Sequence, residues 1–139
     1  MSEIVRSPAR TVTEDDVVRF AELTGDTHPQ HLDAAWVADS AFGERIAHGM
    51  LIASLAVGLV SFDPERVIAL RRIRDLVFKR PVRLGDAIHV RATEAGRRAV
   101  DDETELVSWI WKIVNQRDQT VCQATLEALC RSRPAEAPR

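Results

Sequence analysis

Residues 49–62 read GMLIASLAVGLVSF, an apolar run interrupted only by two glycines and two serines. If this segment is helical it has no polar face, so we expect it to be buried on all sides. At about 1.5 Å per residue the helix would span roughly 21 Å, which is shorter than a bilayer core. The run therefore predicts a central core helix and not a membrane span.

The sequence after Pro64 is typical of an antiparallel sheet. β-branched and aromatic residues occur in runs separated by turn signals, and apolar and polar residues alternate within the runs. We predict hairpin turns at 95–104 and 116–119, and strands at 66–80, 86–94, 105–115 and 120–130. One face of this sheet is expected to be packed, and a curled sheet would bury the apolar helix.

The chain length of 139 residues suits one domain, and periodicity by itself supports an α+β fold. We place this single domain in residues 1–131. Residues 132–139 are rich in proline and charge and are expected to form a disordered tail.

Upstream of the apolar run, the sequence predicts a helix over residues 14–24. Thr13 is a suitable N-cap, three acidic residues follow it at the positive end of the helix dipole, and Gly25 supplies the C-terminal stop. Residues 25–32 are expected to form a polar loop. Asp33 can then cap a second, short helix.

Charge and cysteine content exclude several classes of protein. The formal net charge of -2 and the pI near 6.1 give no basic field for nucleic acid. Residues 1–10 carry charge and proline without an apolar stretch, unlike a signal peptide or membrane anchor, so we expect a cytoplasmic protein. Cys122 and Cys130 are too few for a disulfide framework, no cluster has zinc spacing, and both cysteines are expected to be buried.

The segment over residues 25–33 reads GDTHPQHLD and carries two groups suited to acid–base chemistry. Asp26 can accept a proton, and His31 changes charge near neutral pH, so the two can share and activate one water molecule. The alternative is structural: Asp26 ends the helix or forms an Asx-turn, and His31 is a surface histidine. The spacing alone favours this structural alternative.

Residues 46–50, IAHGM, stand at the entrance to the apolar helix. Free backbone N–H groups at a helix N-terminus can stabilise a developing oxyanion, and Gly49 would allow a close approach. In the alternative interpretation, Gly49 only permits tight packing and His48 only caps the helix.

Together and in this order, the motifs resemble those of the (R)-specific enoyl-CoA hydratases, the MaoC-like branch of the hot dog superfamily. That pattern is a helix, then G-D-x-N-P-x-H, then a helix that begins H-G-M. The first motif is matched by Gly25, Asp26, Pro29 and His31. Residues 48–50 match the second, and FKRPVRLGD at 78–86 is similar to a strand-and-turn segment ending in P-V-x-x-G-D. The similarity covers residues 10–130 and implies a hot dog domain, a curved antiparallel sheet wrapped around a central apolar helix.

The resemblance also implies roles for these residues. Asp26 and His31 would activate the water that adds to C3 of a trans-2-enoyl thioester, and the backbone N–H of Gly49 would polarise the thioester carbonyl. No cofactor is implied beyond the coenzyme A or phosphopantetheine that the substrate carries. Further substrate contacts are expected from His28, Pro29, His48, Met50, Val57 and Arg80.

Two positions depart from the family pattern. His28 stands where the family usually has asparagine, and Val57 stands where some hydratases carry a serine on the central helix. Both changes leave the acid/base pair intact and bear on the substrate and the direction of reaction. A hot dog acyl thioesterase and a non-catalytic acyl-thioester binding subunit of a heteromeric dehydratase are the alternatives. The thioesterase alternative leaves the joint occurrence of the motifs unexplained. A non-catalytic subunit would not need both Asp26 and His31.

Residues 71–83 contain a cluster of basic side chains: Arg71, Arg72, Arg74, Lys79, Arg80 and Arg83. The only acidic residue in this stretch is Asp75. These groups could hold the phosphates of coenzyme A or the acidic surface of an acyl carrier protein. They could equally be a solvated strand face that discourages aggregation.

Oligomerisation is expected because a curled sheet leaves an edge strand whose unpaired backbone groups favour a second copy. The resemblance implies the same, since hot dog enzymes commonly dimerise. We expect a homodimer or larger homo-oligomer with the acyl tunnel at or near the interface, and no nucleic-acid or membrane partner. Trp109 and Trp111 share one strand face and fit either the core or an interface.

Overall fold

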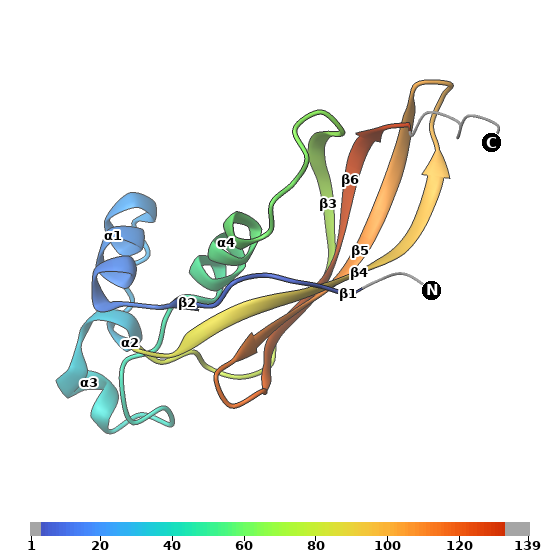
Figure 1. The fold of residues 1–139 in the computed structure, drawn as a ribbon. Helices are drawn as coiled ribbons and strands as arrows, with labels where there is room; N and C mark the ends of the chain where they lie inside the picture. The colour runs from blue at the N-terminus through green and yellow to red at the C-terminus, as the bar shows by residue number, and fades with distance from the viewer. Residues whose placement is uncertain (1–3, 133–139) are drawn as a thin grey trace.

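The computed structural model describes residues 4–132 as one antiparallel sheet with four helices (Figure 1). The helices are α1 (Glu14–Thr24), α2 (Pro29–Leu32), α3 (Ala34–Ala38) and α4 (Gly49–Leu59). The strands are β1 (Ile4–Arg6), β2 (Arg10–Thr11), β3 (Val67–Phe78), β4 (Ala87–Ala99), β5 (Thr104–Asn115) and β6 (Thr120–Arg131). The strand order is β1-β4-β5-β6-β3, and β2 also pairs with β4.

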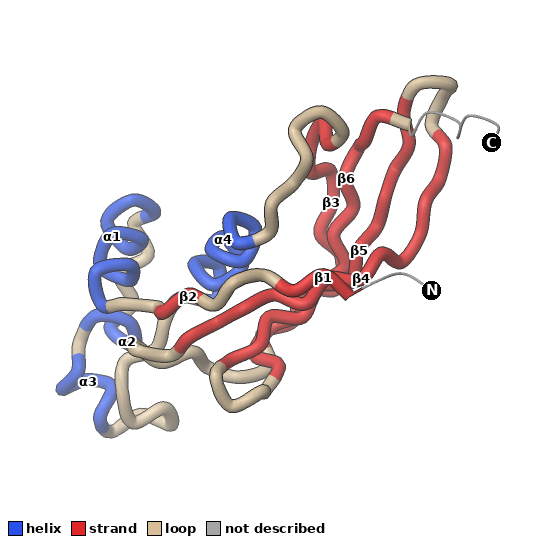
Figure 2. The backbone as a smooth tube through the Cα atoms, viewed as in Figure 1, coloured by secondary structure: helices blue, strands red, loops and turns tan. Residues whose placement is uncertain are grey.

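The sheet curves past α4, while α1, α2 and α3 gather at one end of it (Figures 1 and 2). Leu51, Ile52 and Ala56 of α4 share the main core cluster with side chains from β4, β5 and β6. The predicted α+β hot dog arrangement is confirmed. No helix between residues 4 and 132 is both long and apolar enough to cross a bilayer.

The prediction that the apolar helix is buried on all sides is wrong for the single chain. α4 ends at Leu59, and its outward face carries Met50, Ser54 and Gly58, which are all exposed. Met50 has 51% of its surface accessible. One sheet can cover only one side of a helix, so an apolar surface remains.

The four predicted strands are present, but β4 continues to Ala99 instead of ending at residue 94, and the predicted hairpin at 95–104 shrinks to 100–103. The additional residues read AGRRA, and the charge of Arg97 among them is paired, because Arg97 contacts both Glu94 and Glu105. Strands β1 and β2 were not predicted because two or three residues are too few to display alternation; both are held by pairing with β4.

The two cysteines, Trp109 and Trp111 belong to the core. Cys122 and Cys130 are free and buried, as predicted. Trp111 lies in the main core cluster with its ring stacked 6.0 Å from that of Phe62, and Trp109 packs partly buried against the same cluster. The predicted tail falls outside the described residues except for its first member, Ser132.

Candidate active site

Helix α1 delivers the first candidate residue, and its predicted bounds are confirmed. The Thr13 side chain accepts the backbone N–H of Asp16, and the Asp16 carboxylate accepts that of Thr13, which forms a capping box. Gly25 ends the helix in a left-handed conformation, with φ of 79°. The chain therefore leaves α1 sharply, and Asp26 stands directly after the turn.

The predicted loop over residues 25–32 is corrected, because its second half is the one-turn helix α2. Pro29 occupies the first turn, where a missing N–H does no harm. Nδ1 of His28 accepts the backbone N–H of Gln30 at 3.1 Å, so the imidazole caps α2 as an asparagine side chain would. Asp33 caps α3 as predicted, accepting the N–H of Trp36 at 3.0 Å.

His31 lies inside α2 with only 4% of its surface exposed, so the surface-histidine alternative is wrong. Its Nδ1 lies 2.8 Å from the carbonyl oxygen of Ile46. Because a carbonyl oxygen only accepts, Nδ1 carries the hydrogen of the neutral ring. Nε2 is then the bare nitrogen and can accept a proton; the amide nitrogen of Gln30 lies 3.4 Å from it.

Burial lowers the pKa of His31 below its usual value of 6.5, because the interior disfavours the charged ring. The bond to Ile46 and the charge of Asp26 oppose this shift, whereas His48 and His28 add to it. The net direction keeps the imidazole neutral, as a general base requires.

Asp26 is exposed, and its Oδ1 accepts the backbone N–H of His28 at 3.5 Å, so the predicted Asx-type contact is present. The carboxylate also reaches the histidines: one oxygen of Asp26 and one ring nitrogen each of His31 and His48 lie within 4.8 Å of one another. Such a separation leaves room for one water molecule bonded to both members of the pair.

These three side chains are also the one group that could present ligands to a metal ion among residues 4–132. Their geometry suits acid–base chemistry better. The rings of His31 and His48 are stacked, with centroids 3.8 Å apart and planes 26° apart, so their lone pairs lie in two separate, nearly parallel planes, which disfavours coordination of one ion by both. Nε2 of His48 is also engaged with the Asp26 carbonyl oxygen at 2.9 Å.

The N-terminus of α4 lies beside the pair. The backbone N–H groups of Gly49, Met50 and Leu51 have no acceptor within residues 4–132. His48 occupies the N-cap position of α4, but its side chain makes no capping hydrogen bond. Free amides at the positive end of a helix form a ready site for a negatively charged oxygen.

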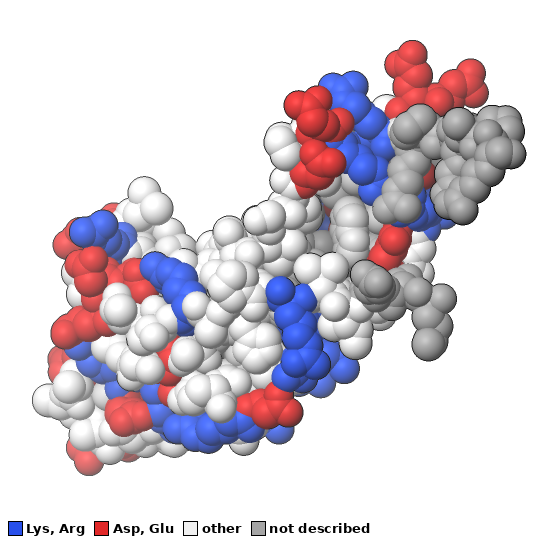
Figure 3. All heavy atoms as spheres, viewed as in Figure 1, with Lys and Arg blue, Asp and Glu red and all other residues white. Residues whose placement is uncertain are grey.

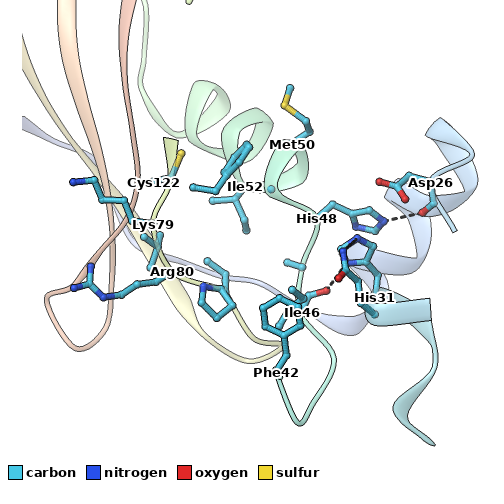
Figure 4. Close-up of a pocket in the computed structure, with 17 residues that line it drawn as sticks. Asp26, His31, Phe42, Ile46, His48, Met50, Ile52, Lys79, Arg80 and Cys122 are labelled. Carbon is cyan, nitrogen blue, oxygen red and sulfur yellow. Dashed lines mark hydrogen bonds between the residues drawn. The ribbon is translucent and has the colours of Figure 1, made fainter. Parts of the chain in front are cut away.

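A cavity of about 490 Å³ joins these parts (Figure 4). Asp26, His31 and His48 stand on one side of it, and Lys79 and Arg80 stand on the opposite side. Its apolar lining includes Phe42, Ile46, Met50, Ile52, Phe78, Val82, Val121 and Cys122. Burial raises the pKa of the Cys122 thiol to about 11, so this group stays protonated and is a poor nucleophile.

The structure brings most of the sequence-predicted residues to this cavity. Asp26, His31, His48, Gly49, Met50 and Arg80 line it, whereas His28 and Pro29 support α2 from outside the lining. Val57 is partly buried against the main core cluster and is also not part of the lining.

Sequence reasoning missed Gln30, Phe42, Phe78 and Cys122 as lining residues. Two of them lie within motifs that were recognised: Gln30 adjoins His31, and Phe78 opens the third motif. Phe42 and Cys122 carry no local signal.

The basic cluster is not a single patch. Lys79 and Arg80 line the cavity, Arg71 pairs with Glu127, and Arg83 pairs with Glu44. Arg72 and Arg74 line a separate hollow with Arg97 and Arg98. On the face shown in Figure 3, basic side chains are scattered among acidic and uncharged ones.

Comparison with known proteins gives consistent matches. The family described as a MaoC like domain matches residues 2–110. Protein MaoC of Klebsiella aerogenes is 46% identical over 88 residues, which are 63% of this chain and 26% of that protein. An (R)-specific enoyl-CoA hydratase of Rhodospirillum rubrum is 36% identical over 90 residues, 65% of this chain and 62% of that protein.

The fold is matched over nearly its whole length by a solved structure. The X-ray structure named monoamine oxidase regulatory protein from Archaeoglobus fulgius is 36% identical, with a TM-score of 0.91, and the match covers 96% of this chain and 92% of that one. The chain spans less than two thirds of the length of both curated relatives.

Proposed function

The chain belongs to the MaoC-like domain family, and on that premise we propose that it is a hydratase or dehydratase that interconverts a trans-2-enoyl thioester and a 3-hydroxyacyl thioester. One observation carries the proposal: a ring nitrogen of the buried His31 and a carboxylate oxygen of Asp26 lie within 4.8 Å of each other at the polar side of an apolar cavity, a separation that one water molecule can bridge. The relative named (R)-specific enoyl-CoA hydratase supports this reaction class and favours the R product.

In the proposed hydration, Asp26 and His31 hold one water molecule, and Nε2 of His31 takes a proton from it. The water oxygen bonds to C3 while the electron pair of the C2–C3 double bond moves towards the thioester carbonyl. The nearby carboxylate stabilises the transient imidazolium. C2 then takes up a proton, which His31 can return, and dehydration follows the same path in reverse.

The α4 N-terminus supports the step that builds negative charge. The backbone N–H of Gly49 is unpaired within residues 4–132 and lines the cavity, so it can donate to the thioester oxygen as that oxygen becomes an enolate. One such donor typically contributes about 10²–10³-fold in rate. The pair supplies the proton transfers, and the helix terminus supplies the oxyanion site.

The charged and apolar parts of the cavity suit a thioester carried on coenzyme A or phosphopantetheine. Apolar side chains fit the acyl chain, whereas Lys79 and Arg80 provide positive charge for phosphate. These two basic residues stand apart from the acid/base pair (Figure 4). A substrate bound in this way would lie across the cavity with its reacting carbons near His31.

We also propose that the working unit is a homodimer joined along β3. This strand pairs with β6 on one side and with no strand of residues 4–132 on the other. It exposes a set of large apolar side chains, Ile68, Leu70, Ile73, Val77 and Phe78. Phe78 and the exposed Met50 also line the cavity, so a second copy on this edge would close it.

The test is a turnover assay with crotonyl-CoA and 3-hydroxybutyryl-CoA, followed by a panel of longer acyl groups on both carriers. We expect loss of enoyl absorbance without release of free thiol. Thiol release with the double bond intact would instead identify a thioesterase. Binding without turnover on either carrier would favour the non-catalytic subunit.

A further inference from the structure

His48 is the residue before α4 and is almost completely buried, with 2% of its surface exposed. Its ring stacks on the ring of His31, with centroids 3.8 Å apart. On another side, the ring of Phe20 from α1 packs against it at 4.9 Å with the planes 60° apart. His48 thus stands between α1, α2 and α4, in contact with the base.

Its hydrogen bond defines which nitrogen carries the hydrogen. Nε2 of His48 lies 2.9 Å from the backbone carbonyl oxygen of Asp26 (Figure 4). A carbonyl oxygen only accepts, so Nε2 donates. Nδ1 is buried and has no partner within residues 4–132. A hydrogen on Nδ1 would be a buried N–H without an acceptor, so the hydrogen of the ring belongs on Nε2.

We infer that His48 is a positioning residue: its imidazole fixes the ring plane of His31 and the main chain of Asp26, and thereby holds the acid/base pair around one water. This inference rests on the proposed hydratase activity. The residue acts through its two neighbours and is assigned no proton transfer of its own.

The two contacts hold the two members of the pair separately. The bond from Nδ1 of His31 to the Ile46 carbonyl restrains that ring at one edge, and the stack with His48 restrains its plane. Asp26 lies in the chain directly after the left-handed turn at Gly25, and its carbonyl is tied to His48. A rotation of His48 would therefore move both groups.

Several charged and titratable groups surround the stacked rings of His31 and His48. Asp26 is the acidic group that faces both rings, and His28 approaches His31 from the start of α2 at 6.2 Å. The Arg45 guanidinium donates to the His31 carbonyl oxygen at 2.7 Å. Lys79 and Arg80 face the assembly across the cavity. Protonation of both stacked rings would place like charges 3.8 Å apart.

Two variants separate the two contacts. His48→Phe keeps a flat ring against His31 but loses the N–H that holds Asp26. We expect its kcat to fall about 10–100-fold, as for loss of other orienting partners, with little change in KM and in the acidic limb of the pH profile. His48→Gln keeps an N–H donor but loses the ring. It should retain more of kcat, while its acidic limb moves to higher pH because water reaches His31.

His89→Gln is the matched control, since His89 lies on β4 away from the cavity lining, and it should leave both kcat and the pH profile unchanged. If the wild type is active and both His48 variants fold but keep the wild-type kcat and pH profile, the inference is overturned. So would a loss confined to KM. Absence of turnover in the wild type would instead refute the proposed function itself.

A measurement on the wild-type protein covers the case in which a variant does not fold. The chain has only four histidines, so their ring nitrogens can be assigned by long-range ¹H–¹⁵N NMR during a pH titration. We expect Nε2 of His48 and Nδ1 of His31 to carry a hydrogen, because each of these nitrogens faces a backbone carbonyl oxygen. A His48 whose Nε2 carries no hydrogen would overturn the inference.

Discussion

The ring of Phe78 lies so close to Gly49 that a β-carbon on this residue would stand 2.8 Å from the ring Cε1 atom. The glycine at the start of α4 thus leaves room for the Phe78 ring at the end of β3, independently of any oxyanion role. Phe78 is 49% exposed, and its ring can move. An added side chain at residue 49 would displace this ring from its present place in the cavity wall.

Gly49→Ala should therefore lower kcat/KM, and Gly49→Val should lower it further. The alanine variant keeps the backbone N–H, so its decrease in kcat/KM should arise from displacement of Phe78. This decrease should be smaller than the about 10²–10³-fold expected for a lost oxyanion donor. Steady-state assays of Gly49→Ala with and without Phe78→Ala check this. Recovery in the double variant is expected; if the second change restores nothing, the displaced ring is not the cause.

Removal of either member of the acid/base pair should reduce turnover by about 10²–10⁴-fold. Asp26→Asn is a conservative variant at an exposed site. For the buried His31, Asn is preferable to Ala because its amide can still donate to the Ile46 carbonyl. The double variant should be little worse than either single one, since both act on one water. Single-turnover assays and circular dichroism measure these effects; full turnover in a folded single variant would rule out the pair.

The acidic limb of the kcat/KM profile should lie below pH 6.5, because burial lowers the pKa of His31. Only the neutral ring can act as base, and it persists to lower pH than in the unfolded chain. The same shift makes the folded state less stable as pH falls below 6.5, since the unfolded imidazole then binds a proton that the folded one refuses. A pH series of initial rates, with thermal unfolding in parallel, checks both directions. A limb well above 6.5 would contradict the assignment.

His28→Asn should retain activity close to the wild type, because an asparagine side chain can accept the Gln30 N–H that His28 accepts now. His28→Ala removes the cap of α2 and should destabilise the fold by about 0.5–2 kcal/mol. It should also lower kcat, since α2 carries His31. Chemical denaturation and kinetics of the two variants measure this, and equal behaviour of Asn and Ala would refute the capping role.

Light scattering should give a particle of at least twice the chain mass of 15.5 kDa. Ile73→Glu places a charge on the exposed edge strand β3 and should shift the particle towards the monomer with loss of activity. Ile110→Glu is the control, since Ile110 is similarly exposed but lies on the central strand β5. A fully active particle of 15.5 kDa in the wild type would refute the dimer.

The sequence by itself determined those features whose causes lie within a few residues. Thr13 and Gly25 bound α1, Asp33 caps α3, and alternation marks the long strands, because caps and faces depend on neighbours two to four positions apart. The order of the motifs added the hot dog fold and directed attention to Asp26 and His31. The hydrogen bond from the Gln30 N–H to Nδ1 of His28 also joins near neighbours. The sequence did not predict it, because a histidine at this position can make several kinds of contact.

The tertiary structure alone decided how these parts meet. Three contacts join residues that are distant along the chain: the stack of His48 on His31, the contact of Phe78 with Gly49, and the ion pair of Arg71 with Glu127 that separates Arg71 from the rest of the basic cluster. The curvature of the sheet also left one face of α4 uncovered. Such contacts depend on the path of the whole sheet, and residue periodicity records only which face of an element is apolar, not which partner covers it.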